Sequence, residues 1–563
     1  MDKKILDLQY LFKNREFSKL IFITENSIND EDRTPSILNI LGVAIILRGP
    51  KNKETFESAI PNFKKSYLKS SQNISCLDSL INLINSTCDL FDLKNSKDNF
   101  FNQFNELTKF CNNFEGLFGH NEKLVLAIVR VYKRLNNIDR VLSYYEQLEK
   151  NKTLSLLSIS HLIYNNSFTN KWSQEDFFSH SKLLEKYTPT YPEEKLSNIN
   201  IKDKDKDKIK IGFLTTDLRR QHSIINFLKS VLNNYNKDKF EIILFLNHFE
   251  DDEDTKFFIK LVDGNINISK TDDIAAINII RDMKIDIMFD LMGITSKPRI
   301  ALFKNRLAPI QIAWLGYCNT TGLDNMDYII SDPNLVFPKE KNLYTEKLIY
   351  LESIWNCHSG FDMKRQKNLL PSDQNKFITF GSFNNFSKIN DNVAKVWSEI
   401  LKNIKNSKLI LKSSLKKDHT RLKEFFKNDG VLDSVIFYDK RDTNLEHLNL
   451  YKDIDIALDT FPYNGVTTSF EAIWMGVPVL TMKGYNFNSR CGESINKNLN
   501  LNFLIAEDNK DYISKAIELA TNKEKLIETR DFIFANAINS PLFDQINFSK
   551  NFYNSLENVL NKM

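Results

Sequence analysis

The sequence has few of the residues that mark fibrous, disulfide-stapled or membrane proteins. Its 563 residues include only 16 glycines and 13 prolines, which excludes collagen-like and other glycine- and proline-rich chains. No window approaches the run of about 18 apolar residues that a membrane-spanning helix needs. The amino-terminal segment lacks an apolar core followed by a small-residue cleavage site, which argues against a signal peptide. These absences predict a cytoplasmic protein without a membrane span.

The cysteines form no recognisable framework. The six are scattered, and no two stand in a C-x-x-C pair. We therefore expect neither a disulfide scaffold nor a zinc site, but free thiols in a reducing compartment. The cysteines are Cys76, Cys88, Cys111, Cys318, Cys357 and Cys491.

Charge and size point to a multidomain globular protein. Lysine and arginine number 76 and aspartate and glutamate 72, a net charge of +4. This near balance disfavours a dedicated nucleic-acid binder, although a local basic pocket for a phosphate remains compatible with it. With 42% hydrophobic and 26% charged residues, the chain has the composition of a folded protein long enough for several domains.

Residues 1–195 have apolar residues at helical spacing and few convincing strands. Leu41-Gly42, Ile45, Ala59 and Phe63 resemble the tetratricopeptide (TPR) pattern. A second match uses Tyr132, Val141, Tyr145 and Leu148, and a weaker one near the start uses Phe17, Leu20 and Ser27. We predict a TPR-like helical domain over 1–195, with a generic helical bundle as the alternative.

A charged linker is predicted over 196–208, which contains the run KDKDKDK, and α/β structure follows it. Short β-branched or aromatic runs alternate with helical stretches, which is typical of parallel sheets covered by helices. The rhythm lapses near 355–372. We therefore predict two Rossmann-like domains, 209–365 and 366–563, with ligands bound beyond the carboxyl ends of the strands. The expected strands are 209–214, 240–246, 285–291, 310–316, 326–331 and 347–352, then 376–383, 408–413, 434–439, 454–459, 477–482 and 502–507.

The segment 453–484 carries the clearest chemical signal. A strand leads to Asn464 and Gly465, then Thr467 and Thr468 open a helix with Glu471 one turn in. A helix start offers unpaired N–H groups and the positive end of a dipole, so these residues suit a phosphate, and Glu471 suits ribose hydroxyls. The same residues also fit an ordinary capping box from Thr468 to Glu471. Taken alone, they favour the capping box.

Longer stretches resemble a known family. ALDTFPYNGVTTSFEAIWMGVPV, APIQIAWLGYCNTTGLDNMDYIISD, FGSFNNFSKIN and NSRCGESI stand in the order found in O-GlcNAc transferase and SPINDLY-type glycosyltransferases. The resemblance spans roughly residues 209–540. It implies an α-helical TPR-like region followed by an α/β GT-B fold, in which two Rossmann-like domains face a cleft.

The resemblance also implies roles for single residues. His222 matches the active-site histidine of the family, and Lys388 matches the lysine that faces the diphosphate. Asn385 lies in the same loop as Lys388, and His447 matches a histidine near the nucleobase. Two departures affect loop detail. Cys318-Asn319 stands where the family often has Pro-Gly, and Val466 where some animal relatives have histidine.

No acid stands out as a catalytic base. Asp286 and Asp290 lie on one alternating strand, where a structural role is at least as fitting as a catalytic one. The acidic run 251–254 has no apolar frame, and we interpret it as a surface loop. Because Lys388 and a helix start can hold a diphosphate, we expect neither a cofactor nor a metal.

The sequence therefore predicts an inverting glycosyltransferase. The expected donor is UDP-GlcNAc and the expected acceptor a Ser or Thr hydroxyl of a polypeptide docked on the TPR-like region. GDP-fucose is the main alternative donor. A sugar-nucleotide epimerase also pairs Rossmann domains but needs no peptide-docking solenoid. A catalytically degenerate TPR scaffold is the non-enzymatic alternative.

Overall fold

The computed structural model describes residues 2–70, 77–93, 121–198, 208–219, 222–248, 252–295, 298–367, 369–412, 419–439, 441 and 443–562. The chain divides into two compact units. One contains the helices up to Ser158, and the other contains the chain from Ile159 onward. Each unit is described by itself. Cys76, Cys111 and most of the predicted linker lie outside the described residues.

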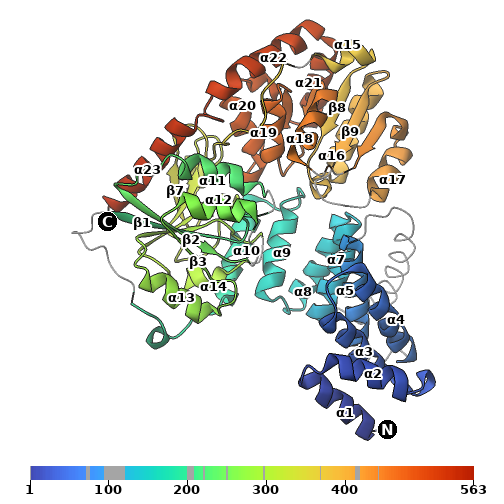
Figure 1. Cartoon of the computed structure of the whole chain (residues 1–563). Helices are drawn as coiled ribbons and strands as arrows, with labels where there is room; N and C mark the ends of the chain where they lie inside the picture. Colours follow the sequence, from blue (N-terminus) through green and yellow to red (C-terminus); the bar gives the residue numbers. More distant parts are fainter. Residues whose placement is uncertain are drawn as a thin grey trace. The chain divides into compact units, whose positions relative to one another are not determined.

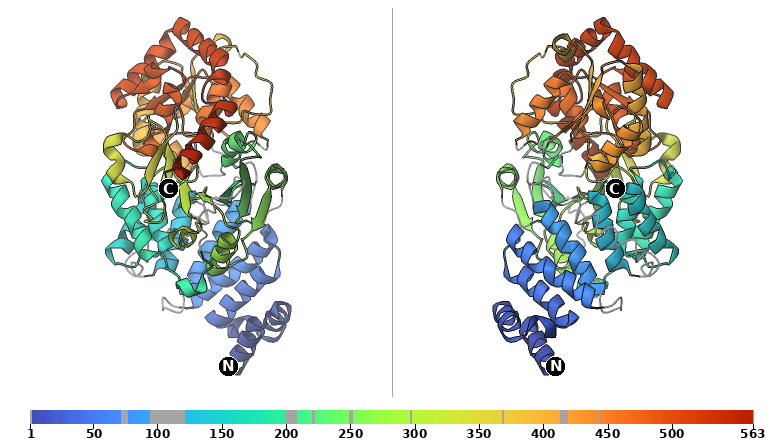
Figure 2. Two further views of the ribbon diagram at one scale, coloured as in Figure 1. Left: turned by 90° about the vertical axis from the view of Figure 1, so that its left-hand side faces the viewer. Right: turned by 90° about the vertical axis from the view of Figure 1, so that its right-hand side faces the viewer.

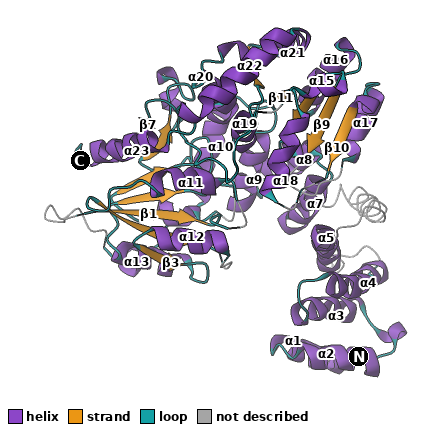
Figure 3. Ribbon diagram, turned by 45° about the horizontal axis from the view of Figure 1, so that its top comes forward, coloured by secondary structure: helices purple, strands orange, loops and turns teal. Residues whose placement is uncertain are grey.

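The amino-terminal unit is helical throughout its described part (Figure 3). Consecutive helices contact one another, from α1 and α2 through α7 and α8, and Figure 2 shows them from two sides. Side-chain caps set several helix starts; Thr34, for example, accepts a hydrogen bond from Ile37 N just before Pro35. The helices are α1 (Asp2–Lys13), α2 (Phe17–Ser27), α3 (Pro35–Arg48), α4 (Lys53–Lys69), α5 (Leu77–Leu93), α7 (Glu122–Arg134) and α8 (Ile138–Lys150).

The repeat-like residues pack where two helices meet. A Cβ on Gly42 of α3 would lie 2.6 Å from the ring of Phe63 on α4, so only glycine lets these helices approach this closely. Ala59 and Phe63 are fully buried. In the later pair, the rings of Tyr132 and Tyr144 stack with centroids 5.7 Å apart. These are helical hairpins of the predicted kind, and their assignment as TPR repeats stays a prediction.

The second unit contains two parallel sheets. The first has the order β3-β2-β1-β4-β5-β6-β7. Its strands are β1 (Ile209–Thr215), β2 (Phe240–Leu246), β3 (Gly264–Asn267), β4 (Ile287–Asp290), β5 (Ile310–Ala313), β6 (Tyr328–Ser331) and β7 (Lys347–Tyr350). The intervening helices include α11 (Ile224–Leu232), α12 (Glu253–Leu261), α13 (Asp273–Asp282) and α14 (Ile300–Lys304).

The second sheet has the order β10-β9-β8-β11-β12-β13. Its strands are β8 (Thr379–Ser382), β9 (Lys408–Lys412), β10 (Val435–Tyr438), β11 (Ile456–Leu458), β12 (Val479–Met482) and β13 (Ile505–Ala506). Its helices include α16 (Asp391–Asn403), α17 (Thr420–Asn428), α18 (Asn444–Asn449), α19 (Thr467–Trp474), α20 (Cys491–Lys497), α21 (Asn509–Thr521) and α22 (Lys523–Asn536).

The carboxyl-terminal helix α23 (Gln545–Leu560) returns to the first sheet (Figure 1). The ring of Tyr553 lies 4.7 Å from that of Phe240 in β2, and Phe552 lies 4.8 Å from Trp314, just after β5. The chain thus crosses between the two α/β halves twice, and large aromatic contacts hold them in one unit.

The helix α10 (Gln174–Tyr187) packs against the first sheet's loops, although the sequence prediction assigns residues up to 195 to the helical domain. Gln174 and Asn319 exchange two side-chain hydrogen bonds, of 2.8 and 3.1 Å. Gly322 has φ of +74°, and a Cβ there would lie 2.0 Å from the carbonyl oxygen of Ser181. Close backbone contact therefore ties α10 to the loop after β5.

The predicted GT-B architecture is confirmed, and all twelve expected strands are present. Strand β3 was missed because it lies at the sheet edge and has one large apolar residue, Ile266. The acidic run was interpreted wrongly as a loop: Asp252 caps α12 by accepting from Thr255 N at 3.0 Å, and Glu253 and Asp254 occupy its first turn. Among the helices of the described residues, none is long and apolar enough to cross a membrane.

Candidate active site

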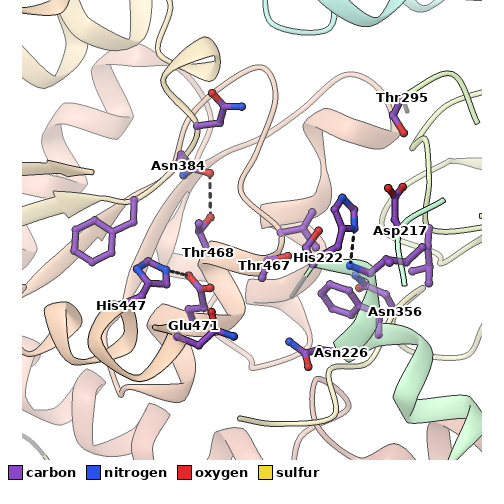
Figure 4. A pocket seen from close by; sticks show the side chains of 18 of the residues that line it. Asp217, His222, Asn226, Thr295, Asn356, Asn384, His447, Thr467, Thr468 and Glu471 are labelled. Carbon is purple, nitrogen blue, oxygen red and sulfur yellow. Dashed lines mark hydrogen bonds and ion pairs between the residues drawn. The ribbon is translucent and has the colours of Figure 1, made fainter. Parts of the chain in front are cut away.

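A cavity of about 660 Å³ lies where loops from both sheets meet within the second unit (Figure 4). Its walls come from segments that directly follow strands, including the loops after β1, β4, β5, β8, β10 and β11. Seven of the nine predicted site residues line it: His222, Asn385, Lys388, His447, Thr467, Thr468 and Glu471. The carboxyl ends of the strands in both sheets therefore converge on one space.

The start of α19 forms part of the wall, and it has no side-chain cap. The capping-box interpretation is wrong here, since Thr468 Oγ1 donates to Asn384 Oδ1 at 3.0 Å and Glu471 bonds elsewhere. The first N–H groups of a helix have no acceptor within the helix. Thr467 and Thr468 line the cavity, and their amides thus stand at the positive end of the α19 dipole, where an anion is favoured.

Asn464 and Gly465 are not among the lining residues; they shape the loop behind the wall. Asn464 Oδ1 accepts from Gly492 N at 3.0 Å, and Gly465 N donates to Asp459 Oδ1 at 2.6 Å. A Cβ on Gly465 would lie 2.4 Å from Thr468 Oγ1. Burial raises the pKa of Asp459 to about 6. Glycine at 465 therefore makes room for the Thr468 hydroxyl.

Lys388 is a half-buried cation on the cavity wall, at the end of the short helix Phe386–Lys388. Its Nζ donates to the carbonyl oxygen of Asn464 at 2.7 Å and lies 4.5 Å from the ring centre of Tyr463. Loss of solvent lowers its pKa to about 8, while the carboxylate of Asp459 opposes this shift. In the same loop, Asn385 Oδ1 accepts a hydrogen bond from Ser387 N at 3.1 Å.

His447 and Glu471 form a hydrogen-bonded group with two residues that the sequence analysis missed. His447 Nε2 lies 2.9 Å from Glu471 Oε2, and Tyr451 Oη donates to the same oxygen at 2.9 Å. Lys412 Nζ lies 2.9 Å from His447 Nδ1. Because an ammonium can only donate, Nδ1 of His447 accepts this hydrogen bond. Nε2 therefore carries the hydrogen and donates it in the hydrogen bond to Glu471. The carboxylate is thereby fixed at the cavity wall.

His222 lies at the other end of the cavity, just before α11. Loss of solvent lowers its pKa, Arg219 adds to this effect, and the nearby carboxylate of Asp217 opposes it. The Ile224 amide approaches Nδ1 at 3.4 Å, which favours the tautomer with a proton on Nε2. Asp217 is buried, follows β1 and also lines the cavity, yet no motif in the sequence singled it out.

The other candidate acids are structural. Asp290 accepts from Met292 N at 2.8 Å and Gly293 N at 3.1 Å, and burial raises its pKa to about 6. Asp286 accepts from Lys210 N at 2.8 Å. Neither is among the residues that line the cavity. Both carboxylates instead tie strand ends to neighbouring backbone.

Two buried thiols lie near Lys388. Cys318 lines the cavity, and Cys491 lies within hydrogen-bonding reach of it. Hydrogen bonding to Cys318, together with burial, raises the pKa of Cys491. Four cysteines are described, and all four are free and buried. In the described part of the chain, no group of three or more histidine, cysteine, aspartate or glutamate side chains is arranged to hold a metal ion.

The chain is similar in sequence to known glycosyltransferases. The profile of glycosyl transferase family 41 matches residues 132–363 and 358–552. A probable UDP-N-acetylglucosamine–peptide N-acetylglucosaminyltransferase SPINDLY of Solanum lycopersicum is 32% identical over 352 residues, covering 61% of this chain and 37% of that protein. The similarly named SEC protein of Arabidopsis thaliana is 28% identical over 357 residues, covering 61% of this chain and 36% of that protein.

A solved structure shares the fold. A mutant of the O-GlcNAc transferase of Thermobaculum terrenum superposes with a TM-score of 0.77, covering 94% of this chain and 97% of that chain at 21% identity. Two parallel sheets, each with its own helices, define a GT-B fold. The chain belongs to glycosyl transferase family 41. Its match covers less than two fifths of the length of the plant relatives.

Proposed function

We propose that the protein is an inverting glycosyltransferase that moves N-acetylglucosamine from UDP-GlcNAc to Ser or Thr hydroxyls of a polypeptide. The observation that carries the proposal is the convergence of Lys388, the uncapped start of α19 and the fixed carboxylate of Glu471 on one cavity. The Lys388 cation and the start of α19 suit a diphosphate, and the fixed carboxylate of Glu471 suits ribose hydroxyls. The printed names of the plant relatives support this donor and acceptor.

In the proposed reaction the acceptor oxygen bonds to the anomeric carbon as the bond from that carbon to the diphosphate oxygen breaks. The leaving diphosphate gains negative charge, which Lys388 and the α19 amides stabilise. The hydroxyl proton leaves to a base at the opposite end of the cavity, where Asp217 is the candidate. With its proton on Nε2, His222 donates a hydrogen bond there more readily than it accepts one.

GDP-fucose is the second candidate donor. The residues at the nucleotide end, Lys412, His447 and Glu471, can hold a ribose or a nucleobase of either kind. The family match names no donor, while the relatives' names favour UDP-GlcNAc. A non-enzymatic scaffold is the third hypothesis, and it predicts that the protein binds neither UDP nor GDP.

We assign acceptor docking to the amino-terminal helices. Stacked helical hairpins offer an extended surface suited to a polypeptide. Large apolar side chains stand exposed on them, including Tyr10, Phe22 and Leu68, each at least 60% exposed. Remote binding energy of this kind positions an acceptor hydroxyl at the sugar.

The test is co-expression of the protein with candidate acceptors, followed by mass spectrometry of Ser and Thr residues. The proposal expects an added N-acetylhexosamine in the parent and none in Lys388→Ala. An added deoxyhexose would select GDP-fucose, and no modification with any acceptor would favour the scaffold. Because we propose that transfer needs no metal, purified activity should persist in excess chelator. Loss in chelator with recovery in magnesium or manganese would contradict that part.

A further inference from the structure

Asn356 stands in the segment that joins the two α/β halves, and its backbone neighbours are held on both sides. The carbonyl of Trp355 accepts from Trp314 Nε1 at 3.0 Å. Ser359 N donates to the carbonyl of Asn226 at 3.0 Å. These contacts fix the segment against the first sheet and α11. The position of Asn356 is therefore set before any ligand arrives.

The side chain of Asn356 is fully buried yet lines the cavity. Among the described residues, neither its Nδ2 nor its Oδ1 has a hydrogen-bond partner. A buried polar group left unpaired costs about 1–3 kcal/mol. Such an amide needs a partner that both donates and accepts, and the cavity is where that partner can enter.

The cavity has two chemically different ends (Figure 4). Lys388, Lys412, the start of α19 and Glu471 belong to the half that contains the second sheet. Asn356 lies with Asp217, His222 and Thr295, on the side formed by the first sheet. A neutral amide is poorly suited to a diphosphate but well matched to hydroxyl or acetamido groups, which carry a donor and an acceptor together.

We propose that Asn356 binds a polar substituent of the transferred sugar and thereby sets which sugar the protein accepts. This rests on the proposed function, because it requires a nucleotide sugar in the cavity. Asn356 pairs both halves of its amide with the sugar, while Lys388 and α19 hold the diphosphate. A donor that lacks the matching group leaves the amide buried and unpaired, which is the basis of its rejection.

The test compares nucleotide with nucleotide sugar in titration calorimetry. Parent, Asn356→Leu and Asn356→Asp are each titrated with UDP, GDP, UDP-GlcNAc and GDP-fucose. We expect UDP or GDP affinity within about twofold of the parent in every variant, and a loss of about tenfold or more for the matching nucleotide sugar in Asn356→Leu. Asn356→Ser gives the same comparison if the leucine variant does not fold.

A matched control is Asn498→Leu. Asn498 is a structural asparagine whose Nδ2 donates to Ser353 O at 3.0 Å and Ser494 O at 2.8 Å. Its loss should lower the melting temperature without changing the ratio of nucleotide-sugar to nucleotide affinity. Donors lacking single hydroxyl groups then identify the contact, because the relevant one weakens binding to the parent but not to Asn356→Leu.

Three outcomes would overturn the inference. Unchanged nucleotide-sugar affinity in Asn356→Leu would mean that the amide holds only water. Equal weakening of nucleotide and nucleotide sugar would make Asn356 a structural residue. If the parent binds neither UDP nor GDP, the proposed function fails and the inference fails with it, a result separate from the first two.

Discussion

The Nε2 atom of His447 lies 2.9 Å from Oε2 of Glu471, although 24 positions separate the two residues in the chain. The imidazole bridges the Lys412 ammonium and the carboxylate, and Tyr451 donates to the same carboxylate oxygen. Hydrogen bonds to a charged group are roughly twice as strong as neutral ones. The Glu471 side chain is thus held in one orientation at the cavity wall.

Glu471→Gln should weaken nucleoside diphosphate binding about tenfold, because a neutral amide replaces the carboxylate that the proposal assigns to the ribose hydroxyls. Titration calorimetry measures this directly. Glu518→Gln is the matched control, since Glu518 is 57% exposed and remote from the lining residues. Equal affinity in parent and Glu471→Gln would remove Glu471 from the binding site.

Lys388 should impose a pH dependence on nucleotide binding. With a pKa of about 8 in the free protein, its ammonium is lost as the pH rises through 8, well before an exposed lysine deprotonates. Affinity for a diphosphate should therefore be full below pH 7 and fall between pH 8 and 9. The arginine of Lys388→Arg keeps its charge over this range. The same fall in affinity between pH 8 and 9 in that variant would contradict the assignment of the pH dependence to Lys388.

Cys318 should be the most reactive of the four described cysteines. It lines the cavity and is 7% exposed, whereas Cys88 and Cys357 are 0% exposed and Cys491 is 1% exposed. Burial also raises the pKa of Cys88 to about 11, which disfavours the reactive thiolate. Alkylation followed by peptide mass spectrometry ranks the sites. A nucleoside diphosphate at ten times its Kd should slow Cys318 labelling about tenfold; unchanged labelling would place the ligand elsewhere.

We expect helix α10 to contribute to the stability of the second unit. A chain that starts at residue 154 should keep the fold of the second unit and bind nucleotide. A chain that starts at residue 196 loses the fully buried Phe177, worth about 2–3 kcal/mol, and leaves Asn319 without Gln174. Thermal melting by circular dichroism should show the shorter chain to be less stable. Equal melting temperatures would mean that residues 154–195, α10 included, are dispensable.

Much of the fold could be predicted because each central strand is a short run of buried β-branched or aromatic residues between helical stretches. Strand β3 was not predicted because an edge strand needs few apolar residues. The residues at the start of α19 could be proposed because that helix follows a strand, whereas His222, Lys388 and His447 were proposed from the family resemblance. Lys412, which approaches His447 from 35 positions away, has no local pattern that marks its role. Asp217 and Asn356 likewise have no local pattern that marks their roles, because they line the cavity only where separate loops come together.

The central claim is that this cavity turns over a nucleotide sugar with Lys388 at the diphosphate. The most direct measurement is the release of UDP from UDP-GlcNAc, and of GDP from GDP-fucose, by the parent and by Lys388→Ala. We expect release from one donor by the parent and a loss of at least about a hundredfold in the folded variant, the cost of removing about 2.7 kcal/mol of charge stabilisation. Release by Lys388→Ala within threefold of the parent, or none by the parent from either donor, would contradict it.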